Sequence, residues 1–369
     1  MYFVISAGGT AGHINPAIAV ADELRSRGHE ILFVGTPDHI EAELAVKAGF
    51  EFKGFSVAGF DKAKPWTLIS SGMKLSKATS QAKKMFKAKR PDAVLGFGAY
   101  VSIPVGRAAA SMGIPLIIHE QNSVPGMANS YLAKKADITA VTYASSASHL
   151  QAKGKLEIIG NPVRASFETE SKQDARAALG LSADGLVLLV FGGSLGAQHL
   201  NEAVCAMKDQ LLAIDGLHVI HSTGQRDHDA VLERLSLTDE QATRWEVRAY
   251  IDNMSQVLAS ADLVISRAGA SSLAEIMTVG VPSVLVPYPY ARGDHQTLNA
   301  ASCVEAGAAQ LVADKDVESP EFSDLVLDLL SSADKRQQMA QACEAMSGSR
   351  ARTMLADMAI DIAKENTYE

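Results

Sequence analysis

Short apolar runs alternate with segments of helical spacing along the first half of the chain. Residues 2–5 form a first apolar run, and residues 17–24 have the apolar spacing of a helix. Further apolar runs lie at residues 31–34, 92–96 and 115–119. Such runs between helices are typical of strands buried in a parallel sheet with helices on both faces. The pattern predicts a doubly wound α/β domain.

The alternation pauses near residues 158–164 and then starts again. Residues 171–184 are polar and predict a connector with one short helix. A run at 186–191 then leads through a glycine-rich turn into a helix predicted over 199–212. Further strands are predicted at 219–222, 263–266, 283–287 and 310–312.

This repeat predicts two doubly wound domains, residues 1–163 and 164–349. Ligands of such sheets bind at the carboxyl ends of the strands. Residues 350–369 contain a predicted helix, which is either an ordinary terminal helix or one that packs back on the first domain.

The amino-acid composition agrees with two soluble domains, and it argues against some classes of function. The chain has 369 residues, of which 47% are apolar, and no apolar run reaches the roughly 18 residues of a membrane span. Three scattered cysteines and a strand that starts at residue 2 lead us to expect a reduced, cytoplasmic setting without a secretory signal. The net charge of −8 argues against a general nucleic-acid binder.

The charge is unevenly distributed. Between Asp61 and Asp92 there are nine basic residues and no acidic one. Apolar residues interleave with these bases: Trp66, Leu68, Ile69, Met73, Leu75, Met85 and Phe86. A basic, apolar surface suits anionic lipid, at about 1 kcal/mol per well-placed Lys or Arg. The alternative is a solvated, lysine-rich helix.

Two glycine-rich turns open the two halves. Ala7-x-Gly9-x-x-Gly12 and Phe191-x-Gly193-x-x-Gly196 nearly match the dinucleotide-binding fingerprint, but both lack its first glycine. Either turn alone could be a tight connection without a ligand. Two of them at equivalent places favour a nucleotide diphosphate between two domains, because backbone N–H groups at a helix N-terminus bind phosphate.

The first turn also carries Thr10 and His13. A helix N-terminus disfavours the imidazolium ion, so a neutral His13 there could accept a proton. The alternative is a histidine that only hydrogen-bonds the loop. Residues 119–122 place four polar side chains at the end of a predicted strand, facing either the ligand or solvent.

Two polar segments of the second half are further candidates. Glu275 follows Ser271 and Ser272 in a small-residue segment, and its carboxylate suits a ribose diol or, alternatively, a helix-capping box. Gln296 and Asn299 share one helical face and suit sugar hydroxyls, unless they are an ordinary polar helix start. Residues 314–316 have the Asp-x-Asp pattern of some metal-dependent transferases, but we expect a surface loop there. The pattern indicates no metal site.

Five motifs occur in a characteristic order, namely Gly8–His13, His119–Asn122, Gly160–Arg164, Gly192–Ala197 and Ala270–Glu275. In this order they resemble the MurG family of peptidoglycan glycosyltransferases over nearly the whole chain. That family transfers N-acetylglucosamine from UDP-N-acetylglucosamine to undecaprenyl-pyrophosphoryl-muramyl peptide (lipid I), forming lipid II.

The resemblance implies a GT-B fold, two doubly wound Rossmann-like domains with an interdomain cleft. It also implies a role in cell wall synthesis, cell shape and cell division, without a cofactor. The first domain would hold the acceptor and the second the donor.

The resemblance further implies a set of site residues. Substrate-binding residues would be Thr10, Ala11, Gly12, Asn122, Arg164, Ser194, Ile251, Ala270, Ser271, Ser272, Leu273, Ala274, Glu275 and Gln296. Ile251 would contact uracil through its backbone, Glu275 the ribose and Gln296 the sugar. His13 and Glu120 match family residues near the acceptor, where His13 would be the base and Glu120 would orient it or replace it.

Two departures from the family pattern concern the glycine turns. Ala11 stands where the family usually has glycine, which costs little if the local φ is negative. Leu195 stands where glutamine is usual, which makes donor contacts there less certain.

The resemblance also gives the basic stretch a function. We expect Trp66, Lys74, Lys83, Lys84 and Lys87 to dock the protein peripherally on the cytoplasmic face of the cell membrane. Other cell-wall synthesis proteins are further expected partners.

Two other functions stay open at this point. A UDP-N-acetylglucosamine 2-epimerase of the same fold would need no lipid surface. A non-catalytic sensor would bind the nucleotide sugar without releasing UDP.

Overall fold

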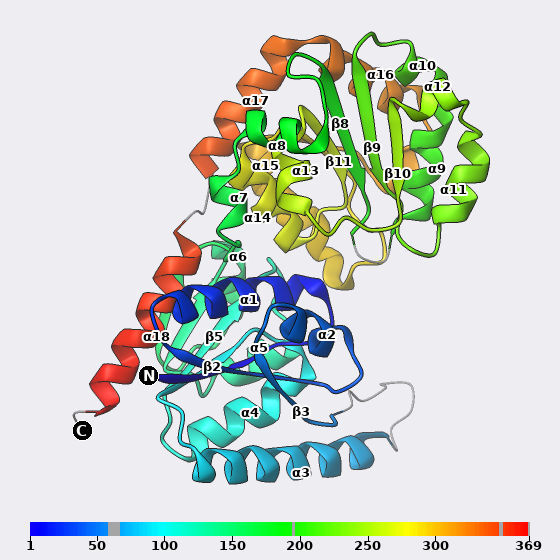
Figure 1. Cartoon of the computed structure of the whole chain (residues 1–369). Coiled ribbons are helices and arrows are strands. Elements are labelled where there is room, and N and C mark those ends of the chain that lie inside the picture. Colours follow the sequence, from blue (N-terminus) through cyan, green and yellow to red (C-terminus); the bar gives the residue numbers. More distant parts are fainter. Residues whose placement is uncertain (58–66, 194–195, 347–349, 368–369) are drawn as a thin grey trace. The chain divides into compact units, whose positions relative to one another are not determined.

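The chain folds into two compact units, seen in a computed structural model that describes residues 1–57, 67–193, 196–346 and 350–367 (Figure 1). Unit 1 consists of Met1–Arg164 and Gly348–Glu369, and unit 2 of Ala165–Ser347. Each unit is built on one parallel sheet.

Unit 1 contains a seven-stranded parallel sheet with strand order β3-β2-β1-β4-β5-β6-β7. Its strands are β1 (Tyr2–Ser6), β2 (Glu30–Gly35), β3 (Glu51–Gly54), β4 (Ala93–Gly96), β5 (Leu116–Glu120), β6 (Ile138–Val141) and β7 (Lys155–Ile158). Its helices are α1 (Ala11–Ser26), α2 (Ile40–Lys47), α3 (Thr67–Ala88), α4 (Ala99–Ser111), α5 (Met127–Ala133), α6 (Ala144–His149) and α18 (Ala351–Thr367).

Helices cover both faces of this sheet, as its apolar strands require. On one face, α1 and α18 bury Ile14, Leu24 and Leu355 against strand residues that include Phe33. On the other face, α3, α4 and α5 form a second core that includes Phe86. A fully buried side chain of this size contributes roughly 1.5–3 kcal/mol.

The C-terminal helix α18 belongs to unit 1 although it follows unit 2 in the sequence. It packs beside α1, as Figure 1 shows for the red and dark blue helices. Arg352 donates to Glu23 at 3.1 Å, and Arg27 pairs with Asp357. The chain therefore returns to its first sheet at its end.

Unit 2 contains a six-stranded parallel sheet with strand order β10-β9-β8-β11-β12-β13. Its strands are β8 (Leu186–Phe191), β9 (Leu217–Ser222), β10 (Trp245–Arg248), β11 (Leu263–Ser266), β12 (Ser283–Leu285) and β13 (Ala309–Leu311). Its α-helices are α7 (Ser166–Thr169), α8 (Lys172–Leu179), α9 (Gln198–Ala206), α10 (Lys208–Leu212), α11 (His228–Leu235), α12 (Asp239–Ala242), α13 (Met254–Ser260), α14 (Ala270–Val279), α15 (His295–Glu305), α16 (Pro320–Ser331) and α17 (Ala333–Met346). Two 3₁₀ turns are η1 (Arg292–Asp294) and η2 (Asp314–Asp316).

The predicted doubly wound architecture is confirmed, with one wrong helix and four strands that the pattern did not predict. The helix expected over 199–212 is two helices, α9 and α10. Met207 interrupts it with φ −85° and ψ 5°, and its amide donates to the carbonyl of Val204, three residues back. The strands not predicted are β3, β6, β7 and β10.

In each unit, the parallel strands end at one common edge of the sheet. The candidate site residues follow these carboxyl ends, so each unit gathers its candidates at one edge.

Candidate active site

The first glycine loop connects β1 to α1 at the carboxyl edge of unit 1. Gly9 has φ 86°, a left-handed conformation that favours glycine. Thr10 is the N-cap residue of α1, but its hydroxyl makes no capping bond and lies 3.3 Å from Nδ1 of His13. Ala11 begins α1 and is not among the described residues with positive φ, so its methyl group causes no backbone strain.

His13 lies in the first turn of α1, where its ring can act as a base. If Nδ1–H donates to the Thr10 hydroxyl oxygen, Nε2 keeps the lone pair that accepts a proton. The contact with Thr10 therefore connects the two polar residues of the loop in one arrangement.

Gly98, the N-cap residue of α4, adjoins this ring. A Cβ atom at Gly98 would lie 2.9 Å from Cδ2 of His13 and 3.5 Å from Nδ2 of Asn129. Gly98 has φ 102°, and the next residue, Ala99, has φ 64°, which is unusual for a residue with a side chain. This turn thus brings His13 and Asn129 to the same place.

Glu120 ends β5 and is only 1% exposed. One carboxylate oxygen accepts from the backbone and side-chain nitrogens of Asn122, at 3.0 and 3.4 Å. The other accepts from the Gly126 amide at 3.0 Å and from Nδ2 of Asn129 at 2.9 Å. Four donors on one carboxylate favour an orienting role for Glu120 over that of a base.

His119, next to Glu120, is a buried neutral histidine. Its Nε2 bonds the carbonyl of Gly160 at 2.9 Å, and burial lowers its pKa to about 4. Gly160 begins the segment that ends with Arg164, the last residue of unit 1 before unit 2. Arg164 lies close enough to Asp22 for its charge to act on that carboxyl. Burial raises the pKa of Asp22, and the charges of nearby arginines, Arg164 among them, only partly offset this rise.

In unit 2, the second glycine loop follows β8. Gly196 has φ 76°, and a Cβ atom there would lie 2.5 Å from the carbonyl oxygen of Thr223, so only glycine fits. The predicted ligand residue Ser194 and the departure at Leu195 lie outside the described residues.

The segment after β11 begins α14 without a side-chain cap. The N-cap residue is Gly269, so Ser271 and Ser272 lie in the first turn of the helix. The alternative in which Glu275 serves a capping box is therefore wrong, because that carboxylate lies six residues beyond the cap. Uncapped amides at a helix N-terminus suit an anion. Leu273 is buried, and its amide donates to the carbonyl of Gly269 at 2.9 Å.

Gln296 connects the segment after β11 to the loop after β12 through hydrogen bonds. Its Oε1 accepts from the amides of Ala268 at 3.2 Å and Tyr288 at 2.8 Å. Both lone pairs of that oxygen are then in use, which leaves the amide NH₂ group to face a ligand. Ile251, which follows β10, is buried.

The surface position expected for residues 314–316 holds for Lys315 and Asp316, which are exposed, but it is wrong for Asp314, whose side chain is 13% exposed. One carboxylate oxygen accepts from Arg267, which is 8% exposed, and the other lies 2.9 Å from Nδ1 of His199. Burial alone would raise the pKa of Asp314, but hydrogen bonds from His199 and Arg267 outweigh burial and lower it. Asp314 therefore connects α9, which follows the second glycine loop, to the end of β11.

The helix α3 carries lysines on its exposed face. Lys74, Lys84 and Lys87 are exposed and Lys83 is partly exposed. Phe86 is buried in the core, so its expected place on an apolar surface is wrong. Trp66 lies outside the described residues.

Two basic residues that follow α3 make contacts with other parts of unit 1. Lys89 pairs with Glu30, and its Nζ lies 4.1 Å from the centre of the Tyr2 ring. Arg90 donates to the carbonyls of Met112 and Gly113. Both residues are exposed, but these contacts hold them to unit 1 beyond the end of α3.

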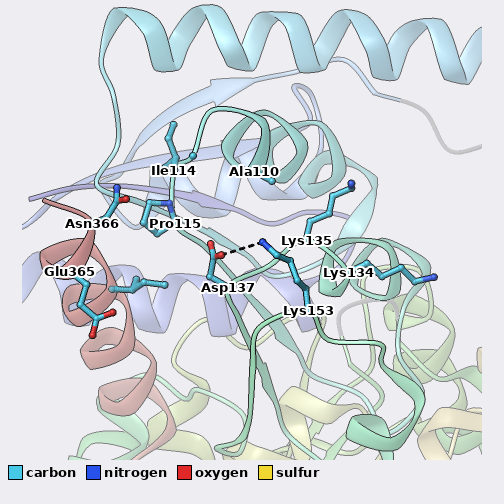
Figure 2. Close-up of a pocket in the computed structure, with 11 residues that line it drawn as sticks. Ala110, Ile114, Pro115, Lys134, Lys135, Asp137, Lys153, Glu365 and Asn366 are labelled. Atoms are coloured by element: carbon cyan, nitrogen blue, oxygen red, sulfur yellow. Dashed lines mark ion pairs between the residues drawn. The ribbon is translucent and has the colours of Figure 1, made fainter. Parts of the chain in front are cut away.

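A cavity of about 550 Å³ lies elsewhere in unit 1, at the amino ends of β5, β6 and β7 (Figure 2). Lys134, Lys135 and Lys153 line it, and Asp137 lies 3.9 Å from Lys153. Since the candidate residues lie at the opposite, carboxyl edge, this cavity is not the candidate site. Among the described residues, no group of three or more His, Cys, Asp or Glu could hold a metal ion. None of the helices in the described ranges is long and apolar enough to cross a membrane.

Three residues that adjoin the site were not predicted: Glu41, Gly98 and Asn129. Gly98 had a sequence signal, because a Gly-x-Gly step at the end of a strand is typical of a tight turn. Glu41 had none, since it occurs in an ordinary helical segment. Its Oε2 nevertheless accepts from the Gly9 amide at 3.3 Å.

Known proteins are similar to this chain over nearly its whole length. The glycosyltransferase family 28 N-terminal domain matches residues 3–141, and its C-terminal domain matches residues 187–354. A relative from Halothermothrix orenii is named UDP-N-acetylglucosamine--N-acetylmuramyl-(pentapeptide) pyrophosphoryl-undecaprenol N-acetylglucosamine transferase. It is 40% identical over 369 residues, 99% of this chain and 100% of the relative. The chain belongs to the MurG family of glycosyltransferases.

Two further similarities agree with membership of the MurG family. A relative of the same name from Desulfitobacterium hafniense is 37% identical over 98% of this chain and 100% of its own length. The solved structure of Acinetobacter baumannii MurG is 28% identical, with a TM-score of 0.75 over 98% of this chain and 99% of that one. The predicted GT-B fold, two Rossmann-like domains with parallel sheets, is confirmed.

Proposed function

We propose that the protein transfers N-acetylglucosamine from UDP-N-acetylglucosamine to lipid I, forming lipid II in peptidoglycan synthesis. The observation that carries this proposal is the near-full-length match to relatives whose name describes this reaction. The polar residues at the carboxyl edges of both units are of the kinds that this chemistry needs.

Unit 2 holds the donor in this proposal. The N-terminus of α14, with Gly269 as its cap residue, offers amides to the diphosphate, together with Ser194 of the second glycine loop. Glu275 binds the ribose, the backbone of Ile251 the uracil, and the amide NH₂ of Gln296 the sugar. The helix N-terminus then stabilises the negative charge that develops on UDP as it leaves.

Unit 1 binds the acceptor and supplies the base. The acceptor oxygen attacks the anomeric carbon and forms the new bond, while the bond from that carbon to the UDP oxygen breaks with its electron pair. The acceptor proton passes to Nε2 of His13, with Nδ1 oriented by Thr10. Attack from the face opposite UDP inverts the anomeric configuration. Glu120 holds Asn122 and Asn129 in place around this position.

We also propose that α3 docks on the anionic cytoplasmic face of the membrane. This docking proposal is supported by the exposed Lys74, Lys84 and Lys87 and by the exposed Met73 on the same helix. A lipid-linked acceptor requires such a position. Lys83 belongs to the same proposed surface, whereas Trp66 lies outside the described residues.

A UDP-release assay tests the activity. The purified protein is given UDP-N-acetylglucosamine with and without a lipid I analogue, and the products are separated. We expect UDP release that depends on the analogue, together with a disaccharide product. An epimerised sugar formed without acceptor would instead identify an epimerase, and binding without UDP release would identify a sensor.

The variant His13→Ala tests the base in the same assay. General-base catalysis is worth about 10²-fold or more, so we expect turnover to fall at least that far. Turnover within about 3-fold of wild type would exclude His13 as the base. His149→Ala serves as the control. It removes an exposed histidine of α6 whose ring bonds the carbonyl of Ser145, and it should keep wild-type turnover.

A further inference from the structure

A buried carboxylate lies directly against the first glycine loop. Glu41 is the second residue of α2 and is 1% exposed. Its Oε2 accepts from the amide of Gly9 at 3.3 Å, and its Oε1 accepts from the amide of Thr36 at 3.0 Å. One side chain thus bonds the loops that follow β1 and β2.

Two glycines leave the space that this side chain fills. A Cβ atom at Gly8 would lie 2.6 Å from Oε1 of Glu41, and one at Gly35 would lie 2.6 Å from its Cγ. Both distances are too short for a real contact, so any side chain at either position would displace the carboxylate. The glycines at the ends of these two strands therefore serve this contact as well as the turns.

The bond to Gly9 determines what the loop can bind. A loop that cradles phosphate does so with its backbone N–H groups. Here the N–H of Gly9 already donates to a carboxylate, whose negative charge also repels a phosphate. Two more amides at the start of α1, those of His13 and Ile14, donate to the carbonyl of Thr10.

The second glycine loop differs in this respect. The amide of Gly196 donates to the carbonyl of Gly193, and no carboxylate accepts from an amide in the described part of that loop. The buried carboxylate of Asp227 does lie against this loop, since a Cβ atom at Gly196 would lie 3.3 Å from its Oδ2, but it accepts from Arg226 and Asn201. The two loops share a sequence pattern, but among the described residues only the first has a carboxylate that accepts from a loop amide.

We propose that Glu41 is a positioning residue for the transfer. It holds the Gly8–Gly9 backbone so that Thr10 meets His13, and it keeps the Gly9 amide from binding a diphosphate. The first loop then presents a base to a sugar hydroxyl, while the donor diphosphate is bound by unit 2. This inference rests on the proposed function, since the positioned base is His13.

The test compares Glu41→Gln with Glu43→Gln. Both changes replace a carboxylate by an amide on α2, but Glu43 is exposed. The NH₂ group of Gln cannot accept a hydrogen bond, so in Glu41→Gln one of the two backbone amides, that of Gly9 or that of Thr36, loses its acceptor. The negative charge of the side chain is lost as well. The readouts are kcat with a lipid I analogue, the Kd of UDP-N-acetylglucosamine by calorimetry, and inhibition by inorganic pyrophosphate.

We expect Glu41→Gln to lower kcat at least tenfold while the donor Kd stays within twofold of wild type. Inhibition by pyrophosphate should strengthen at least threefold, because the loop amide loses its negative partner. Glu43→Gln should match wild type in all three measurements. A purely structural role would not strengthen pyrophosphate inhibition, so unchanged inhibition or a kcat within threefold of wild type would overturn the proposal.

A second variant covers the case in which Glu41→Gln does not fold. Gly8→Ala pushes the carboxylate off the loop without removing its charge, and we expect the same fall in kcat with the donor Kd unchanged. A wild-type kcat in Gly8→Ala would also overturn the proposal. The wild-type protein separates the two hypotheses: if it transfers no sugar at all, the proposed function fails first.

Discussion

At the scale of single residues, the missing side chain of Gly98 sets the position of His13. Gly98→Ala would place a methyl group 2.9 Å from Cδ2 of the ring, at φ 102°. We expect the free energy of unfolding to fall by about 1–3 kcal/mol from backbone strain. We also expect kcat to fall at least tenfold because the ring must move. Denaturant unfolding and the transfer rate at saturating donor measure the two effects.

Gly113→Ala is the matched control. Gly113 also has positive φ, 61°, but a Cβ atom there would meet nothing within 4 Å. This variant should lose stability while it keeps wild-type kcat. If Gly98→Ala also keeps wild-type kcat, the packing of His13 against this turn has no catalytic importance.

Residues close in sequence could be predicted as site residues, whereas contacts between distant ones could not. Thr10 and His13 are three positions apart at the start of a helix, so their proximity follows from helix geometry. The bond from Gly9 to Glu41 joins residues 32 positions apart, and its partner depends on how α2 packs. Spacing along the chain carries no information about such a pair.

At the scale of elements, Asp314 connects two loops of unit 2. Asp314→Asn leaves the guanidinium of Arg267 without its carboxylate in a largely buried position. We expect the free energy of unfolding of unit 2 to fall by about 1–3 kcal/mol. We also expect KM for the donor to rise several-fold, with kcat little changed. Chemical denaturation and donor titrations measure this. Asp316→Asn, at an exposed position two residues on, should have neither effect.

The helix α3 is the element on which membrane docking depends. Reversing Lys74, Lys83, Lys84 and Lys87 to Glu should abolish co-sedimentation with anionic vesicles at low salt, since each lysine contributes about 1 kcal/mol. Reversing Lys134, Lys135, Lys153 and Lys155 changes the net charge equally but leaves α3 intact. If this control loses binding as fully, net charge and not α3 drives docking.

Most strands with continuous apolar runs were predicted, whereas three of the four missed strands, β3, β7 and β10, lie at sheet edges. The exceptions are β6, a buried inner strand that was missed, and β13, an edge strand that was predicted. The central strands β1, β4, β5 and β8 are buried on both faces, so their composition alone identifies them. The edge strands β3 and β7 are largely or partly exposed, and Ile158 of β7 is 54% exposed. Pairing with a neighbouring strand, which the sequence does not record, is what makes these segments strands.

At the scale of the whole molecule, the two units repeat one design with different chemistry. Each has a glycine loop after its first strand, and that similarity is visible in the sequence. The return of α18 to unit 1 was only one of two alternatives, because the periodicity of a terminal helix does not specify its partner. Leu355 and Ala359 show that its partner is the core beside α1.

Each unit also contains a buried neutral histidine, which makes the stability of the whole molecule pH-dependent. Burial lowers the pKa of His119 in unit 1 and of His221 in unit 2 to about 4. Unfolded histidine titrates near 6.5. Above pH 6.5 both states are neutral at these positions, and stability does not depend on them. Between pH 6.5 and 4 the unfolded chain binds protons that the folded chain does not, so the free energy of unfolding falls as pH falls.

Each histidine should contribute a slope of up to about 1.4 kcal/mol per pH unit in that range. Urea unfolding at pH 7, 6 and 5 measures it, and both units should lose stability because each holds one such residue. His221→Gln should make the slope for unit 2 shallower and leave that of unit 1 unchanged, whatever its cost at pH 7; some slope remains because burial also lowers the pKa of His218 in unit 2. An unaltered slope for unit 2 in this variant would mean that other groups cause the acid sensitivity.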